Sequence, residues 1–225
     1  MSTLKKSIVY VLLIGFAITM AFPFFWMVST ALKTNAEIYK IPPALVPKSP
    51  QWSNFSKAWN SGPFNRYLLN TIIIAAVTTT LDLLLSSLGG VAFGKYDFKA
   101  KNILFAIVLG VMVVPPQVTL VPNYLILNWL GWLNTYPGAI VVSIVSPFGI
   151  FLVRQYLQTI PDELMDAARI DGCTEWGIYR KVLLPLIKPV LGTLAIFSFT
   201  GSWNSFMWPL IIMDKQNMYT LQVGL

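Results

Sequence analysis

The 225-residue sequence contains no histidine and only one cysteine, Cys173. An internal disulfide needs two cysteines, so none can form within this chain. A zinc site would lack its usual ligands, and a serine or cysteine nucleophile would lack its histidine base. We therefore expect neither catalytic residues nor a metal site.

Charged residues are scarce as well. They make up 11% of the chain, compared with about 25% in soluble proteins, while hydrophobic residues make up 56%. This composition predicts a polytopic membrane protein, an all-α bundle of helices. The net charge of +7 could point to nucleic acid, but the basic residues form no stripe with aromatic residues. We expect no nucleic-acid partner and attribute the positive charge to loops that face membrane lipid.

Five long apolar stretches predict membrane-spanning helices. They cover about residues 8–32, 67–93, 103–121, 137–157 and 189–212. The first stretch follows two lysines, as in a signal peptide, but it is too long to be one. Pro115 and Pro116 interrupt the third stretch. Either these prolines free backbone groups that line a transport pathway, or the helix ends near Val114 at the membrane surface, and the sequence leaves both open.

Asp82 lies inside the second stretch. A carboxylate within a membrane span faces the bundle interior or water, so it is a candidate functional residue. The alternative is a structural polar contact inside the bundle. Lys95 follows about 20 Å away along a helix, which is too far for a direct ion pair.

Residues 89–95 formally match the phosphate-binding pattern G-x-x-x-x-G-K. That pattern needs a strand before it and Ser or Thr after the lysine. Here an apolar helix is expected before the segment, and Tyr96 follows the lysine. We expect these glycines to allow close packing of helices instead.

A polar connection over residues 33–66 joins the first two stretches and contains five prolines. It is too short and too irregular to build a core of its own. We interpret it as an irregular interfacial loop, and a contact surface for an external partner is the alternative.

One long charged segment, residues 158–188, separates the fourth and fifth stretches. Pro161 can occupy the first position of a helix. An Asp-Gly pair at 171–172 is a turn signal, and a second amphipathic run over 176–184 ends at Pro185. The segment therefore predicts two short helices joined by a tight turn at the membrane surface.

The basic residues predict the orientation of the chain. With the N-terminus in the cytoplasm, ten of the sixteen basic residues lie on the cytoplasmic side. This bias is modest. The same orientation also places residues 158–188 in the cytoplasm.

The charged segment carries a spaced motif. Asp166-Ala167-Ala168 stand three residues before Gly172, and nine further residues separate this glycine from Val-Leu-Leu-Pro at 182–185. The arrangement resembles the EAA loop of ABC-importer membrane subunits, in which E-A-A, three residues, G and nine residues precede I-x-L-P. Two positions depart conservatively, because Asp stands where Glu is usual and Val where Ile is usual.

The resemblance covers nearly the whole chain and is closest to carbohydrate-importer permeases of the maltose type. Its other parts are residues 22–33, 42–47, 70–71, 203–210 and 219–221. That family has six spans with both ends in the cytoplasm, whereas five are predicted here. We therefore expect the sequence to lack a last span and to be truncated or partial.

The resemblance implies a function and a set of partners. Residues 1–225 would form a single ABC-importer transmembrane domain, a non-enzymatic permease that translocates a sugar or oligosaccharide across the cytoplasmic membrane. It would work with a second homologous permease, two ATP-binding cassette subunits and an extracytoplasmic solute-binding protein. It would hold no cofactor, because ATP binds to the partner subunits. The residues implied in coupling to the ATPase are Asp166, Ala167, Ala168, Asp171, Gly172, Leu184 and Pro185.

Sugar sites use amide, hydroxyl and aromatic side chains. Candidates of these types in or near the predicted spans are Asn70, Gln117, Asn123, Tyr124, Trp203 and Asn204. Each could instead be an interfacial anchor or a contact between helices. Alternative functions are an ABC permease for a polyol, glycerol phosphate or peptide, and an ion-driven secondary transporter in which Asp82 would be essential.

Overall fold

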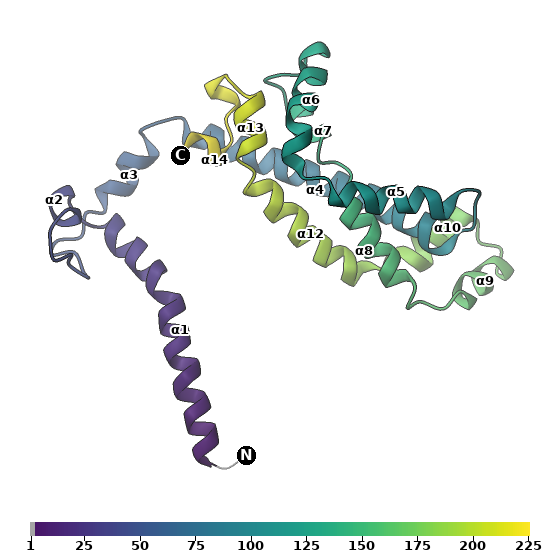
Figure 1. The fold of residues 1–225 in the computed structure, drawn as a ribbon, viewed down its shortest axis with the longest axis horizontal. Helices are drawn as coiled ribbons and strands as arrows, with labels where there is room; N and C mark the ends of the chain where they lie inside the picture. Colours follow the sequence, from purple (N-terminus) through teal and green to yellow (C-terminus); the bar gives the residue numbers. More distant parts are fainter. Residues whose placement is uncertain (1–2) are drawn as a thin grey trace. The chain divides into compact units, whose positions relative to one another are not determined.

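A computed structural model describes residues 3–225 of the chain, and this part is helical and contains no strand. The helices form two compact units, one that ends at Pro63 and one that runs from Phe64 to Leu225 (Figure 1). The first unit is mainly one long helix, and the second is a bundle.

The long helix of the first unit is α1 (Thr3–Ala31), which agrees with the first predicted span to within a few residues. Most of its apolar side chains, among them Leu12, Phe16 and Phe24, are more than half exposed. Such a surface suits lipid tails or another membrane helix.

The connection after α1 folds back onto the end of that helix. It contains two short helices, α2 (Asn35–Ile38) and α3 (Ser53–Trp59). The Lys33 ammonium donates a 2.5 Å hydrogen bond to the carbonyl of Ala44 and lies 4.2 Å from the ring centre of Trp26. The connection is therefore held by its own polar contacts, despite its five prolines.

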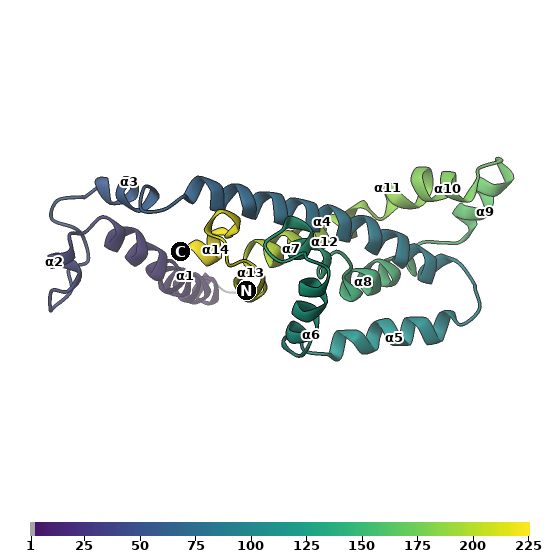
Figure 2. The ribbon, with the colours of Figure 1, turned by 90° about the horizontal axis from the view of Figure 1, so that it is seen from above.

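The second unit is organised around α4 (Phe64–Lys95), a helix of 32 residues. α8 (Pro147–Leu157) and α12 (Lys188–Trp203) pack along it, as Figures 1 and 2 show. The approach of α8 requires glycine on α4, because a Cβ built on Gly90 would lie 2.5 Å from the Cβ of Val153. This confirms the expectation that the glycines near the end of the second span serve helix packing.

The third predicted span is broken at its prolines. α5 (Lys101–Val113) ends just before them, and α6 (Pro116–Trp129) leaves at an angle of 100°. Pro115 is extended, because a residue that precedes a proline disfavours the helical conformation, and Pro116 then opens the next helix. The helix therefore ends near Val114, as one of the two interpretations of the prolines predicts.

The fourth predicted span, residues 137–157, is not a single helix, which corrects the expectation of one spanning helix there. α7 (Tyr136–Val141) and α8 are separated by residues 142–146. Pro147 has no N–H and fixes the first position of α8, while the Ser146 hydroxyl caps the helix by accepting a 3.0 Å hydrogen bond from the N–H of Gly149.

The fifth predicted span, residues 189–212, is divided in the same way. α12 ends at Trp203, and α13 (Met207–Ile212) follows after a three-residue break. Two short elements, η2 (Gln216–Met218) and α14 (Leu221–Gly224), complete the unit.

Two helices of the described chain are long and apolar enough to cross a membrane, Lys5–Ala31 and Phe64–Lys95. The number rises to four if two bent pairs, α5 with α6 and residues 175–186 with α12, are each counted as one span.

The two ends of α4 meet different parts of the second unit (Figure 2). Near its N-terminal end lie α13, η2 and α14, with an apolar cluster that includes Ile74 and Ile212. Near its C-terminal end lies the charged segment, with a second cluster that includes Leu157 and Leu183. α4 therefore connects the two apolar clusters of the second unit.

Candidate functional site

The charged segment forms the helix, turn and helix that the sequence predicts. α9 (Glu163–Ile170) is followed by a turn at Gly172 and then by α10 (Glu175–Ile178). The φ of Gly172 is +80°, a left-handed conformation that glycine adopts readily because it has no Cβ. The first helix begins at Glu163, two residues later than a start at Pro161.

The second helix of this segment is longer than predicted. After α10 the chain continues as a π-helical turn, η1 (Tyr179–Leu183), and as α11 (Leu184–Leu186), before it bends by 74° into α12. The prediction that Pro185 ends the run is wrong. Proline is tolerated there because it falls in the first turn of α11. We call residues 163–186 the charged hairpin.

The motif residues divide between an inner and an outer face of the hairpin. Ala168 is buried with Met165 in the apolar cluster at this end of the unit, so it holds the hairpin together. Ile170 is 86% exposed. The other exposed motif residues are Asp166, Ala167, Asp171, Gly172 and Pro185, and Leu184 is half-buried. Only the outer residues can meet another protein directly.

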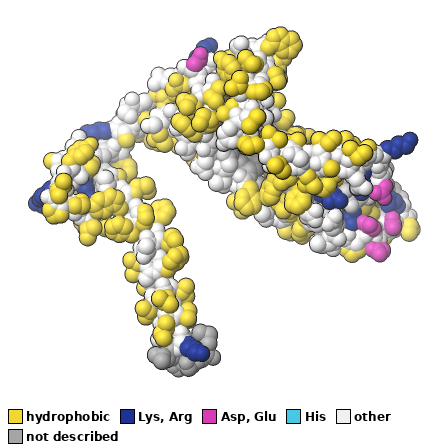
Figure 3. Space-filling model, viewed as in Figure 1, with side chains coloured by type: hydrophobic (Ala, Val, Ile, Leu, Met, Phe, Trp, Pro, Cys, Tyr) yellow, Lys and Arg dark blue, Asp and Glu magenta, His cyan; other side chains and the backbone are white. Residues whose placement is uncertain are grey.

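Arg169 pairs with carboxylates on both helices of the hairpin. Its guanidinium donates 2.9 Å hydrogen bonds to Asp166 and to Glu175. The Tyr96 hydroxyl, just beyond α4, donates a 2.7 Å hydrogen bond to the same Glu175. Figure 3 shows how charged side chains gather at this end of the unit, whereas apolar side chains cover most of the rest.

Lys95, the last residue of α4, anchors the chain just before the hairpin. Its side chain is 4% exposed, and its ammonium pairs with Asp162 and donates to the carbonyl of Ile160. Asp162 itself is largely exposed. Lys95 thus pairs with Asp162 and not with Asp82, as their separation along the helix predicts.

A second contact ties the hairpin to α4. The Tyr179 hydroxyl lies 2.8 Å from the hydroxyl of Ser87, and both residues are buried. Trp176 stacks on Tyr179 with the ring centres 5.0 Å apart. The hairpin thus contacts Ser87 on α4 and Tyr96 just beyond it, and Lys95 holds the residues that lead into the hairpin. A displacement of α4 should therefore carry the hairpin with it.

The hydrogen bond from Lys95 lowers the pKa of the exposed Asp162 carboxyl, and the one from Arg169 lowers the pKa of Glu175. Burial, followed by the bond to Glu175, raises the pKa of Tyr96 to about 12. A carboxyl with a depressed pKa contributes stability above its unfolded pKa of about 4, and that contribution is lost as the pH falls through the folded value.

We expect the hairpin to stay protected at neutral and mildly acidic pH and to loosen only below about pH 4, where these carboxyl groups become protonated. Amide hydrogen exchange over residues 163–179, corrected for its intrinsic pH dependence, measures this. The Glu175→Gln protein should already exchange faster at pH 7. A loss of protection near pH 6 in the wild type would contradict the assignment to carboxylates.

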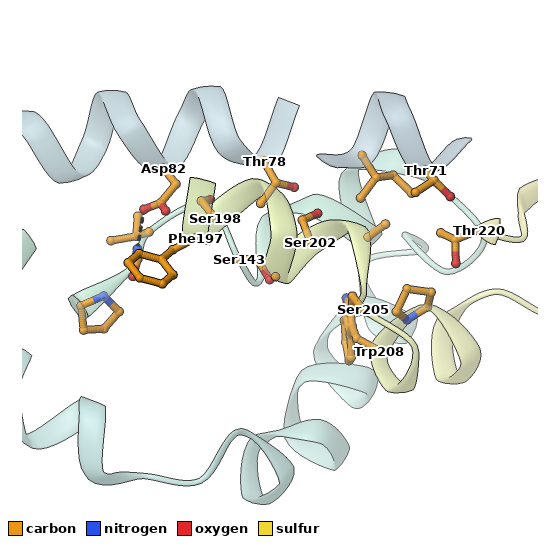
Figure 4. A pocket seen from close by; sticks show the side chains of 17 residues that line it. Thr71, Thr78, Asp82, Ser143, Phe197, Ser198, Ser202, Ser205, Trp208 and Thr220 are labelled. Carbon is orange, nitrogen blue, oxygen red and sulfur yellow. Dashed lines mark hydrogen bonds between the residues drawn. The ribbon is translucent and has the colours of Figure 1, made fainter. Parts of the chain in front are cut away.

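A partly open cavity of about 340 Å³ lies in the second unit, between α4, the break after α7, and α12 (Figure 4). We call it the hydroxyl cavity, because eight of its seventeen lining residues carry small hydroxyl side chains. They are Thr71, Thr78, Ser143, Ser146, Ser198, Ser202, Ser205 and Thr220, together with Asp82 and the aromatic rings of Phe197 and Trp208.

Asp82 connects the hydroxyl cavity to the break in the fourth span. Its Oδ1 accepts a 2.8 Å hydrogen bond from the hydroxyl of Ser86 and a 3.0 Å bond from the N–H of Ser146, at the start of α8. The residue is 2% exposed. Asp82 thus makes the structural contact expected as one alternative, and it also lines a cavity.

Comparison with known proteins places the chain in a family. Residues 86–223 match the model of the binding-protein-dependent transport system inner membrane component family. The chain belongs to this family. It is therefore a multi-pass inner-membrane permease that works with other subunits of an ABC transporter.

Individual relatives agree with this assignment. The arabinooligosaccharides transport system permease protein AraQ of Bacillus subtilis is 37% identical over 91% of this chain and 74% of its own length. The sn-glycerol-3-phosphate transport system permease protein UgpE of Pectobacterium atrosepticum is 31% identical over 96% of this chain and 79% of its own. A crystal structure of a bacterial ABC transporter involved in the import of the acidic polysaccharide alginate shares the fold. Its TM-score is 0.87 at 23% identity, over 99% of this chain and 80% of that chain.

The six residues predicted to contact the solute lie in different parts of the permease. Asn70 is buried and donates to the carbonyls of Asn217 and Tyr219, while its amide oxygen accepts a 2.7 Å bond from Tyr136. It therefore anchors the chain around η2. None of the six predicted residues lines the hydroxyl cavity in the described chain.

The other five predicted residues lie in several places. Gln117 and Asn123 line a neighbouring cavity of about 330 Å³, and Tyr124 lines a separate apolar one. Trp203 stacks on Phe199, with the ring centres 5.7 Å apart, and Asn204 is exposed at the end of α12.

Sequence reasoning on the permease missed the serines and threonines of the hydroxyl cavity. Small hydroxyl residues are common in membrane helices, so each one alone carries little information. Two signals were present nonetheless. Ser198, Ser202 and Ser205 recur at helical spacing on one face, and Ser146-Pro147 is a helix start inside an apolar stretch.

Proposed function

We propose that this permease is a membrane subunit of an ATP-driven importer for a sugar or oligosaccharide, and that its charged hairpin docks onto an ATP-binding cassette subunit. The N-terminus then lies in the cytoplasm. A second permease, a second ATPase subunit and an extracytoplasmic solute-binding protein complete the assembly. ATP binds to the ATPase subunits, and this permease holds no cofactor.

The observation that carries the docking proposal is the outer face of the hairpin. Ile170 projects almost fully into solvent at the tip of α9, and Asp171 and Gly172 follow it. An apolar side chain in this position is a suitable anchor for a cleft in a partner. The pairs made by Arg169 and the contacts with Ser87 and Tyr96 keep the hairpin rigid, so it can transmit a rigid-body motion.

The basic residues support the orientation. Lys95 ends α4, and Arg169 and Lys181 lie on the charged hairpin beside that end. Basic loops favour the cytoplasmic side. A sugar as solute is supported by AraQ, whose name specifies arabinooligosaccharides. Glycerol phosphate remains the alternative solute, because UgpE is named for it.

Co-purification tests the docking proposal. With the neighbouring permease and ATPase co-expressed, Ile170→Asp should reduce the ATPase recovered with this permease by about tenfold or more, because loss of an anchor residue commonly costs 2 kcal/mol or more. Gly172→Pro should do the same, since proline cannot adopt the φ of +80°.

Ile41→Asp is the matched control, because Ile41 is 91% exposed, on the first unit. It should leave the recovery unchanged. Equal recovery of the ATPase with Ile170→Asp and Ile41→Asp, from protein that is inserted and monodisperse, would show that the hairpin tip does not dock.

A further inference from the structure

The hydroxyl cavity contains polar groups that the protein leaves without partners. The hydroxyls of Thr78 and Thr220 are buried, with the residues 3% and 4% exposed, and have no hydrogen-bond partner within residues 3–225. Both hydrogen bonds that Asp82 accepts within the described chain go to its Oδ1. Buried polar groups in proteins are nearly always paired, so the two threonine hydroxyls indicate space for water or a ligand.

The cavity also lies where two spans are interrupted. Residues 142–146, between α7 and α8, supply Ser143 and Ser146, and Ser205 lies in the break that follows α12. Irregular backbone inside a membrane protein is tolerated where it is buried in protein or lines a water-filled cavity. Asp82 lies at the same level, about 20 Å along α4 from its charged end.

The chemistry of the lining matches a hydroxylated, uncharged ligand. Serine and threonine hydroxyls both donate and accept hydrogen bonds, and a carboxylate accepts a strong, charge-assisted bond from an O–H group. Phe197 and Trp208 add flat apolar surfaces, as Figure 4 shows for the positions of these two rings. A volume of about 340 Å³ lies within the range of small-molecule sites.

The charge of the lining is one-sided. Asp82 is its single ionisable residue, and the described residues around the cavity include neither lysine nor arginine. A phosphate or carboxylate in this space would face Asp82 without a compensating cation, which is unfavourable at the low dielectric of a protein interior.

From these observations we infer that the hydroxyl cavity binds an uncharged, hydroxyl-rich part of the solute, which donates to Oδ2 of Asp82, and that the same carboxylate selects against anionic solutes. The inference rests on the proposed function, because it makes the cavity part of the solute path. It also narrows that function, since it favours a neutral saccharide over a phosphorylated or acidic one.

Charged thiol reagents test the selectivity without any knowledge of the natural solute. In the complete importer with Cys173→Ser, Ser202→Cys places one thiol in the cavity. We expect the cationic reagent trimethylammonioethyl methanethiosulfonate to react about tenfold faster, or more, than the anionic sulfonatoethyl reagent, relative to the ratio at an exposed Ser61→Cys. Asp82→Asn should bring the ratio at Ser202→Cys close to the exposed value.

Asp97→Asn is the matched control, because it removes the same charge from an exposed position at the charged end of α4. It should leave the ratio at Ser202→Cys unchanged. Ser143→Cys gives a second reporter from another element of the cavity. Three results would each overturn the inference. They are equal labelling rates for the two reagents, a cationic-to-anionic rate ratio that Asp82→Asn leaves unchanged, and no labelling at either reporter position.

Protection from labelling tests the ligand class. Millimolar arabinotriose, used as a neutral probe, should slow the labelling of Ser202→Cys, and sn-glycerol 3-phosphate should not. Thr78→Val should weaken this protection, whereas Thr80→Val should not, because the Thr80 side chain is exposed on the same helix and bonds only to the carbonyl of Ala76.

Two results would contradict the ligand class. If sn-glycerol 3-phosphate protected the thiol as well as the sugar does, the cavity would not select against anionic solutes. If labelling were slower in sodium than in potassium at equal ionic strength, and the sugar gave no protection, the cavity would be a cation site. Charge-selective labelling in an importer that moves no sugar would retract the proposed function but leave the selectivity of the cavity in place.

Discussion

Replacing Gly90 with leucine should abolish the folded second unit. The Cβ of any side chain at this position would lie 2.5 Å from Cβ and Cγ1 of Val153 and 3.2 Å from the backbone nitrogen of Arg154. Val153 is completely buried, so it has no free space to move into. Overpacking by a single methylene costs about 1–3 kcal/mol, and leucine adds a whole side chain against backbone.

Size-exclusion chromatography of the detergent-solubilised protein, followed by thermal unfolding, measures this effect. Gly110→Leu is the matched control, because a Cβ on Gly110 meets nothing within 4 Å and the glycine lies within α5. It should leave a monodisperse protein of at least wild-type stability, since glycine disfavours a helix by about 1 kcal/mol. A monodisperse Gly90→Leu protein that unfolds at the wild-type temperature would show that α4 and α8 do not pack as described.

Lys95→Met should uncouple the permease without preventing docking. Methionine keeps the apolar stem of the lysine but loses the ammonium that holds Ile160 and Asp162. The carbonyl of Ile160 then loses its partner, and the chain that enters α9 is no longer fixed to the end of α4. Because the outer face of the hairpin is unchanged, the ATPase should still co-purify, while sugar uptake falls by about tenfold or more, as for other displaced functional elements.

Lys99→Met is the matched control. It removes the same charge from an exposed lysine in the loop that follows α4. Uptake should remain near the wild-type rate in this variant. Asp162→Asn should have an intermediate effect, because it removes the exposed half of the contact and leaves the bond to Ile160. Equal uptake in the Lys95→Met and Lys99→Met proteins would show that this anchor does not transmit motion.

The charged hairpin could be predicted from the sequence because its signals are local. An Asp-Gly pair at 171–172 sets the turn, and Met165 and Ala168 have the spacing of a buried helical face. The spacing from Asp166 to Pro185 also indicated the family. The π-helical turn and the position of Pro185 inside a helix could not be predicted in this way, because they depend on packing against α4, including the bond between Tyr179 and Ser87.

The breaks in the fourth and fifth spans were missed for a different reason. Membrane helices are apolar on all sides, so hydropathy marks their extent but not their interruptions. Ser146-Pro147 is a weak signal within a long apolar stretch, and the structure shows the break there, where the N–H of Ser146 donates to Asp82.

The hydroxyl cavity could not be predicted because it is assembled from distant parts of the chain. Thr71 and Thr220, for example, lie almost 150 residues apart and line the same end of it (Figure 4). Chemical type alone, the basis for predicting amide and aromatic residues as solute contacts, does not show which side chains meet in the fold. The structure uses Asn70 as an internal anchor instead.

The most direct test of the docking proposal is a photo-crosslink from the tip of the hairpin. In the Cys173→Ser background, Ile170→Cys labelled with a benzophenone maleimide should form, in native membranes, an adduct with the mass of permease plus ATPase subunit. Ser61→Cys, in the first unit, should form none. No ATPase adduct from Ile170→Cys, or an equal yield from both positions, would contradict the docking of the charged hairpin and with it the proposed route from ATP to the membrane helices.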